Sequence, residues 1–313
     1  MKFKYIYGPV NSRRLGKSLG IDLLPFKTCV FNCVFCQLGR TEKLIKERRE
    51  YVPFNEVIEE VKEGVRRFDP SFITFSGSGE PLLYSRIGEM IDEIKKLFPE
   101  KKICLLTHAP FLEKKEIRKE LLNLDVFSPS LDAGTEKTFL KINRPHPDIK
   151  FENVKEGLLK MKEEFKGEYH LEIMYIEGLN DREEDIKGIK EFVQKLNPDR
   201  IFVNTPIRPP AEEWVNLPSY ERVIEFAKRI SERVEIVYLP CKTQNKGIEK
   251  FEEIIEAIKR RPYEFQEIKE LTGLKDGILR KKLKKEIEKG KIYVKKAFGS
   301  EYYYYRKKGL KGN

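Results

Sequence analysis

The spacing of apolar residues between positions 54 and 230 switches repeatedly between two patterns. In residues 54–67, Val57, Ile58, Val61 and Val65 recur at intervals of three or four, which predicts a helix with one buried face. Short apolar runs separate such segments and predict strands. The predicted helices are residues 54–67, 85–98, 113–122, 151–165, 183–196 and 219–230. The predicted strands are residues 19–26, 72–75, 102–107, 126–130, 169–176, 200–205 and 234–238.

This regular alternation of strand and helix predicts the α/β class. A helix between two strands is the usual crossover that makes consecutive strands parallel. The pattern alone is compatible with an open doubly wound sheet and with a barrel. Barrel enzymes place their chemistry at the carboxyl ends of the strands, so residues that directly follow predicted strands are the first candidates for a site.

The pattern changes near residue 246. The predicted elements there are helices at residues 249–259, 264–271 and 275–289 and strands at residues 291–297 and 301–306. Gly290 suits the end of the third helix, and Gly299-Ser300 suits a hairpin turn. Three helices followed by a two-stranded ribbon are similar to a winged-helix (α+β) domain. We therefore expect two domains, residues 1–245 and 246–313.

Charge separates the same two parts of the chain. The 313 residues carry a formal net charge of +11. From Lys259 to the end there are 18 Lys and Arg against 7 Asp and Glu, so this segment accounts for the whole excess. Hydrophobic residues make up 40% of the chain, which is enough for a core. No apolar run approaches the ~20 residues of a membrane span and no signal peptide opens the chain, so we expect a cytoplasmic protein without a membrane partner.

Three cysteines lie in the eight-residue stretch C-V-F-N-C-V-F-C, at Cys29, Cys33 and Cys36. Three thiolates can hold three irons of a four-iron cubane and leave the fourth iron open to a small molecule. The alternative is a structural zinc site, which needs four ligands. The other two cysteines, Cys104 and Cys241, are far apart in the sequence, and five cysteines in a chain of this length do not suggest a disulfide framework.

Two further motifs follow predicted strands. Residues 76–81 read S-G-S-G-E-P, and residues 128–134 read S-P-S-L-D-A-G. Together with the cysteine loop, they resemble the radical S-adenosylmethionine (radical SAM) superfamily, whose second motif is G-G-E-P; here Ser78 replaces one glycine. Residues 8–20, G-P-V-N-S-R-R-L-G-K-S-L-G, resemble a small group of radical SAM proteins related to enzymes that build molybdenum cofactor, nitrogenase cofactor and wyosine.

The resemblance implies a partial (βα)6 barrel with two cofactors, a [4Fe-4S] cluster and S-adenosylmethionine (SAM). Cys29, Cys33 and Cys36 would ligate the cluster, and Glu80 would accept a hydrogen bond from the amino group of SAM. Reductive cleavage of SAM would yield a 5′-deoxyadenosyl radical, with a ferredoxin or flavodoxin as electron donor. The enzyme would be an oxidoreductase or a transferase. The other residues that the resemblance places around SAM are Phe35, Gly77, Ser78, Gly79, Pro81, Ser130 and Asp132.

Each of these assignments has a structural alternative. The S-G-S-G-E-P segment can be a plain strand-to-helix turn, and Ser130 or Asp132 can cap the next helix. Glu172 alternates with its neighbours along a predicted strand, so it faces either into or out of the barrel. His108 follows another strand. A cationic ring for a phosphate or carboxylate can be formed by Arg13, Arg14, Arg144, His146 and Arg208, although solvated arginines are equally typical of a surface.

The basic tail suggests the substrate class. In the helix predicted at residues 275–289, we expect Ile278, Leu279, Leu283 and Ile287 to face a small core and the lysines to face solvent. The rings of residues 302–305 could stack on unpaired bases. We therefore expect RNA, tRNA more than DNA, to be the partner of this domain and a nucleotide in it to be modified.

Two alternatives remain. The enzyme could act on a small metabolite or peptide, with the winged helix docking a protein. The chain could also be an iron–sulfur DNA-binding regulator, which would have no need of a SAM pocket.

Overall fold

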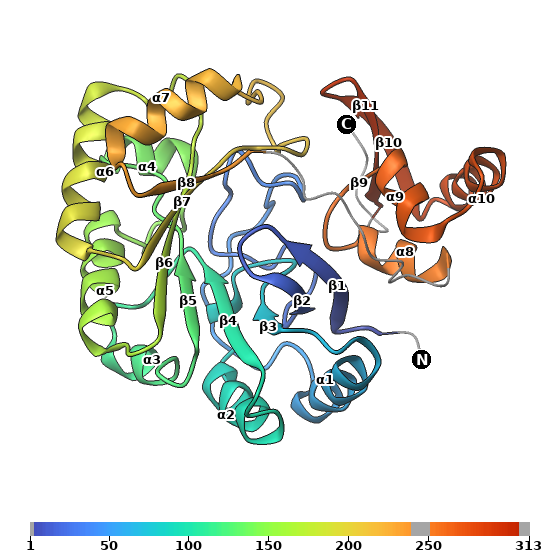
Figure 1. Cartoon of the computed structure of the whole chain (residues 1–313), viewed down its shortest axis with the longest axis horizontal. Helices are drawn as coiled ribbons and strands as arrows, with labels where there is room; N and C mark the ends of the chain where they lie inside the picture. Colours follow the sequence, from blue (N-terminus) through green and yellow to red (C-terminus); the bar gives the residue numbers. More distant parts are fainter. Residues whose placement is uncertain (1–2, 239–250, 307–313) are drawn as a thin grey trace.

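A computed structural model describes residues 3–238 and 251–306 of the chain. Its main feature is a curved sheet in the order β1-β2-β3-β4-β5-β6-β7-β8, in which β1 is antiparallel to β2 and all later neighbours are parallel (Figure 1). The strands are β1 (Ile6–Ser12), β2 (Gly16–Ile21), β3 (Phe72–Phe75), β4 (Lys102–Thr107), β5 (Val126–Pro129), β6 (Glu168–Met174), β7 (Arg200–Asn204) and β8 (Val234–Val237).

Helices connect the parallel strands and lie along the outer side of the sheet (Figure 1). They are α1 (Phe54–Phe68), the short 3-10 helix η1 (Pro81–Leu83), α2 (Ile87–Leu97), α3 (Lys115–Lys119), α4 (Glu136–Ile142), α5 (Phe151–Glu164), α6 (Glu183–Leu196) and α7 (Tyr220–Ile230). Their buried residues join those of the sheet in one large apolar core. The predicted α/β class is therefore confirmed.

The differences from the predicted elements have local causes. Strand β1 was not predicted; it contains Gly8 and Pro9, and its register with β2 shifts between Tyr7 and Val10, as an edge strand tolerates. The strand predicted at residues 19–26 ends at Ile21 instead, and the next residue, Asp22, accepts a hydrogen bond from the Ser78 hydroxyl. Helix α4 was also missed, since seven residues give little periodicity.

The carboxyl-terminal part has its own core. Its elements are α8 (Phe251–Ile258), β9 (Tyr263–Glu264), α9 (Phe265–Thr272), α10 (Asp276–Glu288), β10 (Ile292–Ala297) and β11 (Ser300–Tyr305). The three strands form a separate antiparallel sheet in the order β10-β11-β9. A cluster of buried residues between Phe251 and Tyr303 fills this part without residues from the large sheet. The predicted boundary at residues 245 and 246 lies outside the described residues.

These elements pack beside β1, at the side of the sheet that the outer helices leave uncovered (Figure 1). Arg260, next to α8, donates to the backbone oxygen of Lys4 and lies 3.3 Å from a carboxylate oxygen of Asp22. Arg67 of α1 pairs with Glu253 of α8 at 3.3 Å. The two parts are thus joined by charged contacts.

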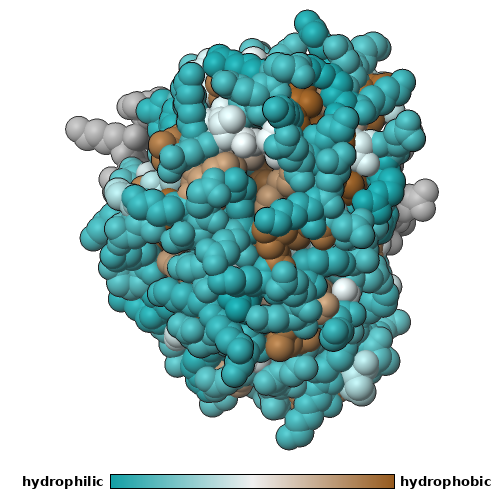
Figure 2. All heavy atoms as spheres, turned by 90° about the vertical axis from the view of Figure 1, so that its left-hand side faces the viewer, coloured by the Kyte–Doolittle hydropathy of each residue, from teal (hydrophilic) through white to brown (hydrophobic). Residues whose placement is uncertain are grey.

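Hydrophilic side chains cover most of the face seen in Figure 2, and hydrophobic ones form small patches and the floor of a hollow. Within residues 3–238 and 251–306, no helix is long and apolar enough to cross a membrane.

Asp185 provides a test of how α6 is held to the motif after β5. This fully buried carboxylate accepts hydrogen bonds from the backbone nitrogens of Gly134 and Thr135 and from the hydroxyls of Thr135 and Thr138, over distances of 2.7–3.1 Å. Because Asp185→Ala leaves these buried and half-buried donors without an acceptor, we expect it to lower the free energy of unfolding by about 2–4 kcal/mol. Urea unfolding would measure this.

The exposed neighbour Glu184 is the matched control for that experiment. We expect Glu184→Ala to change the free energy of unfolding by less than about 0.5 kcal/mol. Equal effects of the two substitutions would contradict the assigned role of Asp185.

Candidate active site

The three cysteines of the C-x3-C-x2-C motif lie in the loop between β2 and α1. Cys33 is buried, whereas Cys29 and Cys36 are half-buried, and all three are free thiols. Each sulfur has an N–H donor: the Phe31 backbone for Cys29 at 3.4 Å, Asn143 for Cys33 at 3.6 Å and Lys27 for Cys36 at 3.2 Å. Such donors stabilise sulfur as a thiolate, so the loop fits the ligand set of an iron–sulfur cluster.

Burial raises the pKa of the Cys29 thiol to about 12, and the neighbouring Cys33 adds to this rise. Metal binding removes the proton from a thiol and so opposes this rise.

The zinc alternative finds no support in the part of the chain that the structure describes. There, no three His, Cys, Asp or Glu side chains converge on a point where one ion could bind. Cys104 is buried with Leu15 and Val126 in a separate apolar cluster, and Cys241 lies outside the described residues. A cubane does not require this convergence, because each thiolate binds a different iron.

The S-G-S-G-E-P segment packs directly on the start of the cysteine loop. Gly77 has a φ of +123°, and a Cβ atom on Gly79 would lie 1.8 Å from the Thr28 carbonyl oxygen. The Glu80 nitrogen donates to that same oxygen at 3.3 Å. Both positions therefore need glycine for contacts within the protein, a reason that the sequence did not reveal.

Glu80 ties the ends of β3 and β4 together. Its buried carboxylate accepts from the Thr107 hydroxyl at 2.5 Å, from the His108 nitrogen at 2.9 Å and from the Leu82 nitrogen at 3.1 Å. Burial raises the pKa of this carboxyl, and the hydrogen bonds from Thr107 and His108 oppose the rise. Pro81 begins a 3-10 helix directly after it.

Ser78 points away from the site. Its hydroxyl donates to Asp22 at 2.6 Å and its nitrogen to the same carboxylate at 3.0 Å. The serine that replaces a glycine of the family motif thus has a partner of its own in this chain.

Asp132, after β5, holds three elements in place. It accepts from the Met174 nitrogen at 2.9 Å and from Asn143 at 2.8 Å, and the His108 ring nitrogen lies 3.3 Å away. Neither Ser130 nor Asp132 is the N-cap of α4, because Thr135 fills that position. Asn143 is a member of the site that the sequence did not indicate, because it follows a helix that was not predicted.

An inner cavity of about 430 Å³ lies beside the motifs. Among the residues assigned to SAM from the sequence, it is lined by Gly77, Gly79, Glu80, Pro81 and Ser130. Phe35, Ser78 and Asp132 are not in its wall; the Phe35 ring instead stacks on His108, with centroids 6.1 Å apart. A volume of this size lies within the range of small-molecule binding pockets. The residues fit SAM beside a cluster held by the cysteine loop.

The structure also settles which way Glu172 points. The Ser128 hydroxyl and the Asn204 amide both donate to it at 2.7 Å from neighbouring strands, and Arg14 pairs with it. Glu172 therefore faces the inner side of the curved sheet and not the helices.

The predicted cationic ring separates into two groups. Arg13, Arg14 and Arg208 line the inner cavity. Arg144 instead pairs with Glu212, and His146 lies near Asp148, so neither contributes to the cavity wall.

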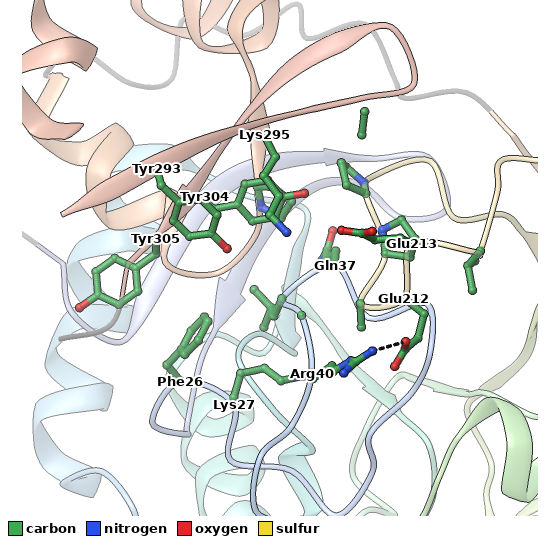
Figure 3. Close-up of a pocket in the computed structure, with 18 of the residues that line it drawn as sticks. Phe26, Lys27, Gln37, Arg40, Glu212, Glu213, Tyr293, Lys295, Tyr304 and Tyr305 are labelled. Atoms are coloured by element: carbon green, nitrogen blue, oxygen red, sulfur yellow. Dashed lines mark hydrogen bonds and ion pairs between the residues drawn. The ribbon is translucent and has the colours of Figure 1, made fainter. Parts of the chain in front are cut away.

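A second, outer groove of about 1340 Å³ lies between the cysteine loop and the β10–β11 hairpin. Figure 3 shows Tyr293, Lys295 and Tyr304 of the hairpin across from Lys27 and the other labelled residues of the loop. Gln37, directly after Cys36, lines both the outer groove and the inner cavity. The two spaces therefore adjoin at the cysteine loop.

The cysteine loop makes a direct prediction about metal content. We expect anaerobically reconstituted protein to hold about four irons per chain and Cys33→Ala to lose most of them, because a buried ligand is removed. Iron analysis and the visible absorption of the cluster would measure this. Cys104→Ala removes another buried thiol and should leave the iron unchanged; full iron in Cys33→Ala would exclude Cys33 as a ligand.

Comparison with known proteins agrees with the motifs. The model of the radical SAM superfamily matches residues 23–192. A UPF0026 protein of Methanocaldococcus jannaschii is 34% identical over 223 residues, covering 70% of this chain and 69% of that protein. A UPF0026 protein of Synechocystis is 36% identical over 208 residues, covering 66% of this chain and 77% of that protein.

A longer relative from Brachyspira hyodysenteriae, named "GTPase Obg", is 36% identical over 299 residues, or 93% of this chain. The chain spans only 44% of that protein's length.

Solved structures show the same fold at low identity. A radical SAM methyltransferase from Sphaerobacter thermophilus has a TM-score of 0.54 at 17% identity and covers 71% of this chain and 66% of its own. SuiB from Streptococcus suis, bound to S-adenosylmethionine, has a TM-score of 0.51 at 17% identity and covers 74% and 51%. The chain is related to the UPF0026 proteins and belongs to the radical SAM superfamily. It is therefore an enzyme whose cofactors are a [4Fe-4S] cluster and SAM.

Proposed function

We propose that this enzyme modifies a nucleotide in structured RNA such as tRNA. Cys29, Cys33 and Cys36 hold the cluster in this proposal, and SAM lies in the inner cavity against Gly77, Gly79 and Glu80. The cofactors supply a 5′-deoxyadenosyl radical when they are bound and reduced. The observation that carries the RNA assignment is a set of exposed lysines on α10 that have no carboxylate partners among the described residues.

The carboxyl-terminal elements support a nucleic-acid-binding role. Their order, α8-β9-α9-α10-β10-β11, is that of a winged helix, and we assign residues 246–313 to such a domain. In that arrangement α10 is the helix that approaches nucleic acid and the β10–β11 hairpin is the wing.

The exposed face of α10 is strongly cationic. Lys281, Lys284 and Lys285 are exposed, and none of them has a carboxylate partner among the described residues. On α5, by contrast, Lys160 is paired with Glu156. An unneutralised lysine face attracts phosphates and releases their counterions.

The apolar residues of α10 only partly follow the prediction. Leu279 and Leu283 are buried as expected. Ile278, predicted to face the core, is instead 50% exposed, because it lies one position away from the buried stripe.

The aromatic residues of the wing also follow the prediction only in part. Tyr302 and Tyr303, predicted to stack on bases, are buried and belong to the protein interior. Tyr304 and Tyr305 do line the outer groove, and Tyr304 stacks on Tyr293 with ring centroids 5.1 Å apart (Figure 3). Trp214, 51% exposed, lines the groove as well. Such rings suit unpaired bases.

A second candidate is a small-metabolite or peptide substrate. The observation that favours it is that Arg260, Arg261, Tyr263 and Glu267 line the inner cavity, so the carboxyl-terminal part also shapes the site itself. For the electron donor we propose a ferredoxin or flavodoxin that approaches the cysteine loop, where Lys43 supplies positive charge.

RNA binding can be tested with the full chain. We expect replacement of Lys281, Lys284 and Lys285 by Gln to weaken tRNA binding by about tenfold and to reduce the slope of log K against log salt by about 2–3, because three cations are lost. Filter binding over a series of salt concentrations would measure both. The control replaces Lys187, Lys190 and Lys195 on α6 in the same way. If wild-type protein binds tRNA without salt dependence, the assignment fails.

Turnover gives an independent test. Reduced protein with SAM and tRNA in heavy water should release 5′-deoxyadenosine and change the mass of a nucleoside in the digested RNA, whereas Cys33→Ala should do neither. If 5′-deoxyadenosine is released equally with and without tRNA, and the added tRNA is unchanged, the small-molecule candidate is supported instead.

A further inference from the structure

The wall of the inner cavity is rich in arginine. Its five arginines are Arg13, Arg14, Arg208, Arg260 and Arg261. Arg14 is neutralised by Glu172, and Arg260 is held by Asp22 and by backbone oxygens of Lys4 and Glu256. These two therefore have structural partners.

Arg208 differs from them. It follows β7, and only 19% of its side chain is exposed. Its single ion-pair contact within the described residues is to Glu267, at 3.7 Å, which is beyond hydrogen-bond distance. Burial, together with the adjacent Arg261, lowers the pKa of Arg208 to about 10, so it stays charged at neutral pH.

Glu267 cannot neutralise Arg208, because Arg261 already occupies it. Both terminal nitrogens of Arg261 donate to the two Glu267 oxygens, which is the bidentate arrangement. Two guanidinium groups thus share one carboxylate. The third cation at this end of the cavity is Arg13, whose charge also acts on Arg208.

We infer that Arg208, with Arg261 and Arg13 beside it, binds a phosphate group of the substrate inside the inner cavity. A guanidinium presents a planar fork of N–H donors that matches phosphate oxygens, and here the fork has no competing acceptor at hydrogen-bond distance among the described residues. This inference rests on the proposed function, and it names the part of the nucleotide that is recognised.

The position of this phosphate site relates it to the cofactors. Gly77, Gly79, Glu80 and Ser130 line the same cavity as Arg208. A nucleotide that is held by its phosphate at Arg208 would therefore share this cavity with SAM. Because Arg261 and Glu267 belong to the carboxyl-terminal part, the site is complete only when that part is docked on the sheet.

Binding to the full chain tests the inference without turnover. The probes are inorganic phosphate, a nucleoside 5′-monophosphate, tRNA and, as a carboxylate, citrate, each measured by calorimetry or equilibrium dialysis. We expect Arg208→Gln to lower the affinity for the nucleotide about tenfold to hundredfold, because charge-assisted hydrogen bonds are lost. Arg208→Lys keeps the charge but loses the planar fork of N–H donors. Its affinity for the nucleotide should therefore lie between those of the wild-type protein and Arg208→Gln. The control is Arg222→Gln on α7, an exposed arginine near Glu177 and Glu225.

Three results would overturn the inference. The first is unchanged binding of phosphate and nucleotide by a folded Arg208→Gln protein, with its melting temperature as the check on folding. The second is an equal loss of SAM affinity in that variant, which would assign Arg208 to the SAM carboxylate. The third is tighter binding of citrate than of the nucleotide.

The same measurements separate this inference from the proposed function. If a mononucleotide binds through Arg208 while tRNA does not bind, the phosphate site stands and the RNA assignment fails. If tRNA binds through the α10 lysines while Arg208→Gln alters no affinity, the RNA assignment stands and the phosphate site fails.

Discussion

The close contact between the S-G-S-G-E-P segment and the cysteine loop is the constraint on which the site depends. With Gly79 against the Thr28 carbonyl, no side chain fits between the end of β3 and the residue before Cys29. Glu80 then fixes the end of β4 to that of β3 through Thr107 and His108. The cysteine loop and the cavity wall are thus positioned by backbone contact and one buried carboxylate.

Buried carboxylates repeat this role along the carboxyl edge of the sheet. Asp22, Glu80, Asp132, Glu172 and Asp185 are all buried, and each accepts hydrogen bonds from a neighbouring strand or loop. A buried charge without such donors would be costly, so each carboxylate restricts the loops around it to one arrangement. Glu80 and Asp132, predicted from the sequence to contact SAM, therefore also have a structural role.

The carboxyl-terminal part combines two electrostatic environments. Its outer surface carries lysines that are exposed to water, which solvates their charge, and salt screens that charge. Its inner surface brings Arg261 and Glu267 against Arg208 in a confined cavity, where each unbalanced charge has a larger effect. The carboxyl-terminal part therefore presents positive charge in two different surroundings, one exposed to water and one confined.

The sequence by itself determined the α/β class, the approximate positions of seven parallel strands and the three-cysteine loop, because these depend on local periodicity and spacing. It also located the positive charge, which is a matter of composition. Tertiary structure alone decided that Glu172 faces inward, that Ser78 binds Asp22, that Arg208 lines the cavity while Arg144 does not, and that Tyr302 is buried. Each of these outcomes depends on a partner far away in the chain, and no local pattern of residues specifies which distant side chain will arrive beside a given one.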